Sequence, residues 1–338
     1  MTPSQAAVDR AEATVRTDTG LIWDSHDGRP VANPVGTAVL PLAYDDADDR
    51  GNEPCTAIDM PARRTDAAAY AHDGTLEGML CAVRAAIRNH DAHADVVARD
   101  ELQPRLGQEV IPVDTCMPHA LQMRRLVEYA LGTQAFHCIR TAAASQGPDT
   151  GTRIHRFLAY AIPASGRTGC SRCARKGECT NACERPRSCP LLDDVSVPAV
   201  FGLIELYRTV MNERHLMLQF MRFEHREGDV WFARCNPKAS VVPLLMDWFA
   251  ARFNDQRFVI YDENHGISGV YDGSGWFLVG GDAPTPPPES ADEQMMRAAW
   301  KRFYTSLSVE ARYHPELRRN FMPMRLWRNL PEMSPAGK

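Results

Sequence analysis

The chain has 338 residues, 44% of them apolar, which is enough to bury a full-sized core in one large domain or two smaller ones. Disorder of the whole chain is therefore excluded. The formal net charge of −5 conceals a segregation of charge, because residues 1–60 carry eleven acidic residues against four arginines, whereas residues 297–328 carry eight basic residues against two glutamates. We expect a polyanion to be drawn to the second of these segments.

The sequence predicts a soluble, cytoplasmic protein with no membrane contact. Its longest apolar runs, such as residues 241–246, fall far short of the roughly 20 residues that a membrane helix needs. The polar stretch at residues 2–10 does not have the pattern of a signal peptide. In a reducing cytosol the ten cysteines would stay reduced, which argues against a disulfide framework.

The first 66 residues are predicted to form an acidic N-terminal appendage with one strand at 37–44. From residue 67 the pattern changes to strand, turn and helix, with Asp73 and Gly74 in the turn and Thr75 as the helix cap. Further elements are expected at 109–114 (extended), 117–131 and 133–145 (a helical pair broken at Gly132), and 153–162 (helix).

The second half of the chain alternates helices with strands. Pro198 opens a long helix, and Ser240 is expected to cap another that buries Trp248. Strands are expected at 220–225, 230–235, 257–262, 267–271 and 276–279. We therefore predict an α+β fold, an antiparallel sheet of hairpins with packed helices, rather than a parallel nucleotide-binding sheet.

The predicted α+β body spans residues 67–282 and contains a Cys-rich insert at 163–190, and a Pro-rich linker with a basic C-terminal segment makes up 283–338. The insert has almost nothing to bury, so something other than a hydrophobic core must hold it. Its five cysteines are close enough in sequence for four thiolates to bind zinc or a four-iron iron–sulfur cluster in a metal knuckle, with unliganded thiols as the alternative. The candidate metal ligands are Cys170, Cys173, Cys179, Cys183 and Cys189.

Several separated stretches of the chain carry a likeness to a known family. They are residues 72–83, 213–215, 220–223, 258–262 and 312–332, and the last is the most specific. These stretches resemble a family of DNA-metabolism and DNA-repair proteins that are encoded beside a radical-SAM protein and whose domain also occurs fused to uracil-DNA-glycosylase-like domains. The resemblance implies a DNA-repair context and a radical-SAM partner, but no mechanism. The chain departs from the family pattern at Gln219, His314 and Leu326.

The basic C-terminal segment is the expected nucleic-acid contact, because its arginines can neutralise phosphates while its rings stack on bases. The alternative is that the rings pack inward and the arginines only face solvent. The candidate binding residues are Arg312, Arg318, Arg319, Arg325, Trp327 and Arg328.

Four residues are candidates for acid–base catalysis if they converge in space: Glu213, His215, Asp262 and His265. The alternative is helix-end polarity and, at His265, turn chemistry. The chain contains no Gly-rich phosphate loop, Gly-x-Ser-x-Gly elbow or His-Glu-x-x-His motif.

Three functions remain open on the sequence. The first is a nucleic-acid-binding accessory or processing factor of DNA repair that acts with a radical-SAM protein. The second is a lesion-processing enzyme, a glycosylase or nuclease, in its own right. The third is a protein-interaction scaffold.

Overall fold

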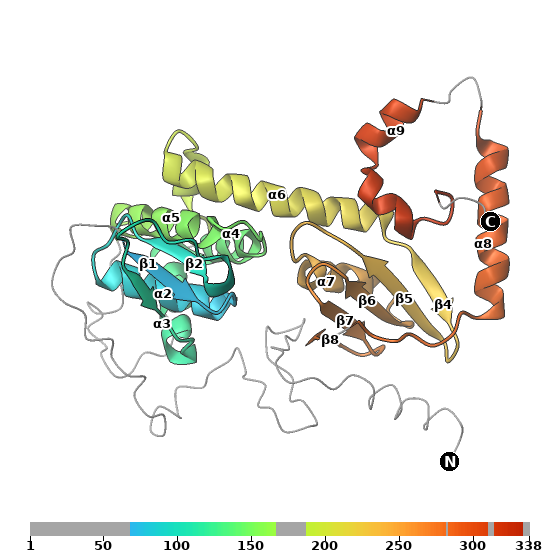
Figure 1. Cartoon of the computed structure of the whole chain (residues 1–338), viewed down its shortest axis with the longest axis horizontal. Coiled ribbons are helices and arrows are strands. Elements are labelled where there is room, and N and C mark those ends of the chain that lie inside the picture. Colours follow the sequence, from blue (N-terminus) through green and yellow to red (C-terminus); the bar gives the residue numbers. More distant parts are fainter. Residues whose placement is uncertain (1–67, 167–186, 282, 310–313, 334–338) are drawn as a thin grey trace, which may run out of the picture. The chain divides into compact units, whose positions relative to one another are not determined.

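The computed structural model describes residues 68–166, 187–281, 283–309 and 314–333 (Figure 1). These residues fall into two compact units, which we call the first unit (up to Asn212) and the second unit (from Glu213). The boundary lies within the long helix α6 (Pro198–Phe220). The expected N-terminal appendage, including its strand at 37–44, lies outside the described residues.

The first unit is built on a parallel three-stranded sheet in the order β2–β1–β3. Its strands are β1 (Ala69–His72), β2 (Asp95–Ala98) and β3 (Val110–Pro112). The prediction of an antiparallel sheet is wrong here, because helix α2 (Leu76–Arg88) carries the chain from β1 back to the start of β2 and so makes the two strands parallel. The short 3₁₀ helix η1 (Arg99–Glu101) follows β2.

Helices complete the first unit and form its core with the buried strand β1. They are α3 (Met117–Ala130), α4 (Thr133–Ala143), α5 (Thr150–Ala164), the 3₁₀ helix η3 (Pro190–Asp193) and the start of α6. The predicted cap is confirmed, since the Thr75 hydroxyl accepts a hydrogen bond from the backbone N–H of Gly78. The predicted break is confirmed too, because Gly132 separates α3 from α4 with φ = 95°, which favours glycine.

The second unit contains a mixed five-stranded sheet in the order β4–β5–β6–β7–β8 (Figure 1). Its strands are β4 (Phe223–Arg226), β5 (Val230–Cys235), β6 (Arg257–Asp262), β7 (Ile267–Tyr271) and β8 (Trp276–Gly280). The three predicted hairpins are antiparallel as expected. The β5–β6 pair corrects the prediction, because these strands are joined through helix α7 (Val242–Arg252) and run parallel.

Helix α7 packs on the sheet through an aromatic cluster that includes Phe223, Phe249 and Phe258. A Cβ at Gly269 in β7 would come within 2.3 Å of the Met246 sulfur, so the helix approaches this strand closely. Two details of the prediction are wrong: Val241 rather than Ser240 holds the cap position, and Trp248 is 40% exposed because it lies on the outer side of α7.

The C-terminal part of the second unit consists of helix α8 (Ala291–Leu307), helix α9 (Pro315–Phe321) and the 3₁₀ helix η5 (Met324–Asn329). The Ser290 hydroxyl caps α8 by accepting a hydrogen bond from the backbone N–H of Glu293. No helix in the described part of the chain combines the length and apolar character needed to cross a membrane.

Candidate functional site

The carboxyl ends of β5 and β6 bring together the densest set of predicted functional residues. These strands are parallel neighbours in which Cys235 pairs with Asp262, so both chains leave the sheet at the same edge. In sheets with parallel strands, ligands bind in the crevice outside such ends. The loop that follows β5 and the turn between β6 and β7 therefore form the candidate site.

Asp262 and His265 form a hydrogen-bonded pair in the turn that follows β6. The Nδ1 atom of His265 lies 2.5 Å from Oδ2 of Asp262, and the side chains are 4% and 0% exposed respectively. The other carboxylate oxygen, Oδ1, accepts the backbone N–H groups of Asn264 and His265. The carboxylate therefore fixes both the turn and the imidazole.

The second ring nitrogen of His265 is left for another partner. Nε2 has no hydrogen bond with a described residue, and the His265 side chain as a whole is 4% exposed. With Nδ1–H donated to Asp262, Nε2 carries the lone pair of the neutral ring. This is the arrangement of a histidine base that a carboxylate orients.

Glu213 forms a second, structural pair beside the same loop. Its buried carboxylate accepts the backbone N–H of Lys238 at 2.9 Å and is paired with the Arg325 guanidinium at 2.7 Å. Arg325 also donates to the carbonyl of Asn236 at 3.1 Å, and the Asn236 amide donates to the carbonyl of Arg325. Arg325 therefore fastens η5 to the loop after β5, so its guanidinium is already engaged by protein groups.

Cys235 lies between these acidic groups at the end of β5. Burial, followed by the negative charges of Asp262, Glu263 and Glu213, raises the pKa of its thiol well above the usual value. The thiol donates to the carbonyl of Tyr261 at 3.4 Å. Cys235 is therefore a neutral, packed thiol rather than a nucleophile.

Glu263 holds two arginines at the rim of the site. Its carboxylate forms ion pairs with Arg234 at 3.4 Å and with Arg328 of η5. Both guanidinium groups remain about half exposed. The two guanidinium groups balance the charges of Glu263 and of the neighbouring Asp262, and each has N–H groups with which it can also donate to an anionic ligand.

His215 does not join this site. It is exposed on α6, and its ring Nε2 lies 2.9 Å from the side-chain amide of Gln219 one helical turn away. The structure thus brings together Glu213, Asp262 and His265 but not His215. Sequence reasoning missed the residues that complete the site, namely Arg234, Cys235, Asn236 and Glu263, although their position directly at the ends of two predicted strands was a signal that could have found them.

The remaining predicted nucleic-acid contacts lie on α9 and η5. Arg318 lies over the Trp327 ring at 5.0 Å, and the indole N–H of Trp327 donates to the carbonyl of Met322. Arg319 is exposed, and Arg312 lies outside the described residues. Arg319 is therefore the predicted contact on α9 whose side chain is exposed.

Four of the predicted metal ligands, Cys170, Cys173, Cys179 and Cys183, lie outside the described residues. Cys189 is described and is buried in the core of the first unit, and burial raises the pKa of its thiol. Within the described residues, no group of three or more His, Cys, Asp or Glu side chains is placed to hold a metal ion. Cys116 is disulfide-bonded, which departs from the expectation that the thiols stay reduced.

The Asp262–His265 and Glu213–Arg325 pairs of the candidate site lie within one stretch of the chain that is similar to a known domain. No curated protein matches the sequence. Residues 185–332, which contain α6, the mixed sheet and the C-terminal helices, match the model of a domain of unknown function, DUF4130.

Proposed function

We propose that this chain is a nucleic-acid-processing protein of DNA metabolism in which His265 acts as a general base for phosphodiester hydrolysis. The observation that carries the proposal is the pairing of His265 Nδ1 with the fully buried Asp262 at the ends of two parallel strands, with Nε2 making no hydrogen bond to a described residue. The sequence resemblance supports the DNA-metabolism context. The same resemblance suggests a radical-SAM protein as the partner.

In the proposed reaction, Nε2 takes a proton from a water molecule as the water oxygen attacks phosphorus. The new P–O bond forms while the ester P–O bond on the opposite side breaks, the leaving oxygen takes a proton from solvent, and the imidazolium then returns its own proton to solvent. The buried carboxylate of Asp262 stabilises the imidazolium that forms meanwhile.

The two arginines on Glu263 fit the charge of such a substrate. Arg234 and Arg328 are about half exposed and share a single carboxylate, so each can also donate to a phosphate oxygen. Because they lie at the rim, we expect them to contribute mainly to substrate binding. The Glu213–Arg325 pair supports the loop after β5 and takes no part in the chemical step.

The test is cleavage of a labelled single-stranded oligonucleotide and of a simple aryl phosphodiester by the full-length chain. His265→Gln should lower the rate by at least about 100-fold. His215→Gln is the matched control, because this histidine is exposed and its ring is hydrogen-bonded to Gln219 rather than to the candidate site, and it should leave the rate unchanged. An unchanged rate in His265→Gln, or no cleavage by the wild-type chain with or without added divalent metal, would contradict the proposal.

A second candidate is an accessory role without catalysis, in which the chain binds nucleic acid for its partner. The specific observation in its favour is the exposed set of rings and cations on the C-terminal helices. Retention of nucleic acid without cleavage would support this role over the enzymatic one. Retention of the partner without nucleic acid would instead support a protein-interaction scaffold.

A further inference from the structure

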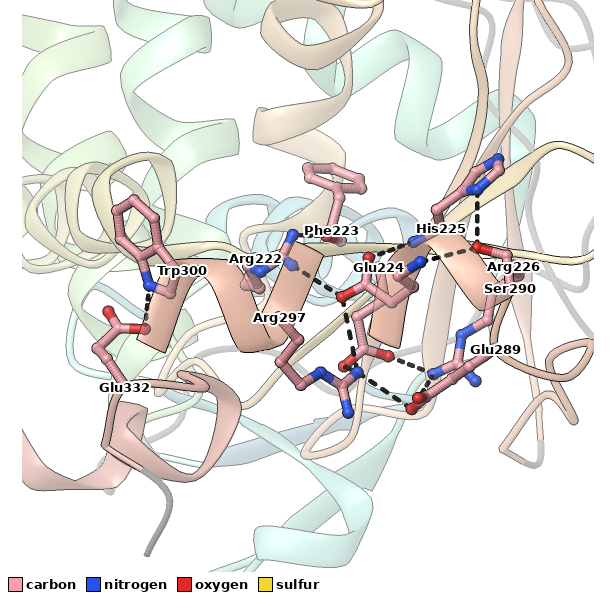
Figure 2. Close-up of polar contacts among 11 residues, drawn as sticks. Arg222, Phe223, Glu224, His225, Arg226, Glu289, Ser290, Arg297, Trp300 and Glu332 are labelled. Atoms are coloured by element: carbon pink, nitrogen blue, oxygen red, sulfur yellow. Dashed lines mark hydrogen bonds and ion pairs between the residues drawn. The ribbon is translucent and has the colours of Figure 1, made fainter. Parts of the chain in front are cut away.

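Helix α8 is fixed to the body of the second unit mainly through its N-terminal half (Figure 2). Its Glu293 is buried and accepts from Arg222 at 2.8 Å and from the backbone N–H of His225 at 3.0 Å. One turn further on, Arg297 pairs with Glu289 at 3.0 Å and with Glu224 at 3.2 Å. This network ties the start of α8 to strand β4.

The rest of α8 has an apolar face that remains in solvent. Met296, Trp300, Phe303 and Leu307 follow one another at spacings of four, three and four residues, so they share one side of the helix. Each is more than two-fifths exposed. Figure 2 shows the Trp300 indole at this end of the helix, where its N–H donates to Glu332 at 2.8 Å and its ring remains 42% exposed. An exposed apolar stripe of this length marks an interaction surface.

A groove lies between the C-terminal end of α8 and helix α9. Its volume is about 460 Å³, and its lining includes Tyr304, Leu307, His314, Leu317, Arg318 and Phe321. Phe321 is 72% exposed, so one side of the groove is an uncovered aromatic ring. This ring is therefore available to a ligand that enters the groove.

The charge around the groove is positive. Arg318 is part of the groove lining, and Arg319, the next residue of α9, is exposed. Lys301 and Arg302 follow Trp300 in the sequence but lie on the opposite side of α8 from the apolar stripe. The C-terminal half of α8 carries no acidic residue, and α9 carries Glu316 alone. Exposed rings together with cations match a ligand that offers both flat aromatic faces and phosphates.

We propose that the groove between α8 and α9 binds single-stranded nucleic acid, with an unpaired base against Phe321 and neighbouring bases on Phe303 and Trp300. Arg319 contacts a phosphate. A duplex does not fit this site, because its bases are stacked on each other and cannot reach the rings. This inference rests on the proposed function for the choice of nucleic acid as the ligand, and it adds that the substrate is single-stranded.

The experiment is fluorescence anisotropy of the full-length chain with a labelled oligothymidylate of about 12 nucleotides and with a duplex of equal length. Phe321→Ala and Phe303→Ala should each weaken binding of the single strand by at least about fivefold, the lower end of the range for losing one stacked base. Arg319→Gln should weaken binding and also reduce the steepness of its salt dependence.

Matched controls come from exposed residues of the first unit. Phe201→Ala removes a ring on α6 that is 51% exposed, and Arg156→Gln removes an exposed cation on α5. Both should leave the affinity unchanged. Because all five substitutions are at exposed positions, loss of the fold does not explain a difference between them.

Two results would overturn the inference. One is equal affinity of the ring variants and the wild type for the single strand. The other is a concentration-dependent dimer that Phe303→Ala converts to monomer without any change in oligonucleotide affinity, since the stripe would then bind a second copy. The test of binding can be told apart from the test of catalysis. His265→Gln should abolish cleavage and leave the affinity for the single strand intact, whereas Phe321→Ala should lower that affinity.

Discussion

The Nδ1 atom of His265 lies 2.5 Å from Oδ2 of Asp262, while Oδ1 of the same carboxylate accepts two backbone N–H groups of the turn. Because Oδ1 is occupied by the turn, Oδ2 is the atom that determines the tautomer of the imidazole. One carboxylate therefore has a structural role through one oxygen and a chemical role through the other, and these roles can be separated by substitution.

Asp262→Asn should abolish the proposed base activity while keeping the turn. The amide oxygen can still accept the backbone N–H groups, so the NH₂ group then faces His265 Nδ1. Since Nδ1 must now accept a hydrogen bond, the proton moves to Nε2 and the base is lost. We expect a rate drop of about 100-fold or more, with the ring tautomer read by nitrogen NMR. Unchanged activity, or an unchanged tautomer, would rule out this role for the carboxylate.

Glu213→Gln should destabilise the second unit without any direct effect on chemistry. The substitution leaves Arg325 beside a neutral amide and removes the charge partner of a guanidinium that is only 22% exposed. Breaking a buried pair from one side costs about 3 kcal/mol. Denaturant unfolding followed by tryptophan fluorescence checks this, because every described tryptophan lies in the second unit.

The control for that measurement is Asp229→Asn in the same unit. Asp229 also pairs with a basic residue, His225, at 3.2 Å, but its side chain is 85% exposed, so the change should cost less than about 1 kcal/mol. Equal losses for the two variants would show that the Glu213–Arg325 pair does not fasten η5 to the loop.

Local signals in the sequence were sufficient for most elements of the fold but not for the pairing of strands. Thr75 caps helix α2, and Gly132 takes the left-handed backbone conformation that separates α3 from α4. Both features depend only on neighbouring residues, so the sequence could predict them. The parallel pairing of β1 with β2 and of β5 with β6 depends on how a helix returns across a sheet. Strand β2 was missed because it has only four residues and follows directly on the charged loop at 90–94.

The sequence could predict which residues belong to the candidate site, but not how they contact one another in space. Asp262 and His265 are three residues apart, so their contact could be anticipated from turn chemistry. Glu213 and Arg325 are 112 residues apart, and their pairing follows from the packing of η5 on the loop after β5. For the same reason, the sequence did not distinguish Arg325, which is paired and mostly buried, from Arg319, which is exposed.

Cys189→Ala should leave any bound metal in place, whereas Cys173→Ala should release it. Cys189 is packed in the core of the first unit, and its burial raises the thiol pKa, which disfavours the thiolate that a metal requires. Four other predicted ligands remain, the number that zinc or a four-iron cluster needs. Iron and zinc analysis after anaerobic purification is the measurement. Loss of metal from Cys189→Ala alone would reverse the assignment.

The first unit should lose stability in mild acid because of His155. The ring is fully buried on α5, neither nitrogen has a partner in the described structure, and burial lowers its pKa to about 4. Between that value and the ordinary pKa of 6.5, the unfolded chain binds a proton that the folded chain does not. Lowering the pH from 6.5 to 4 therefore removes stability, by at most about 3 kcal/mol.

His155→Leu isolates this contribution from the other histidines of the unit. The variant should show a weaker loss of stability between pH 6.5 and 4, because leucine takes up no proton in either state. At neutral pH it should be at least as stable as the wild type, since two unpartnered ring nitrogens leave the core. Hydrogen exchange of peptides from α5 and β1 measures the first unit directly. Identical pH dependence in the variant and the wild type would show that protonation of His155 does not drive the acid sensitivity.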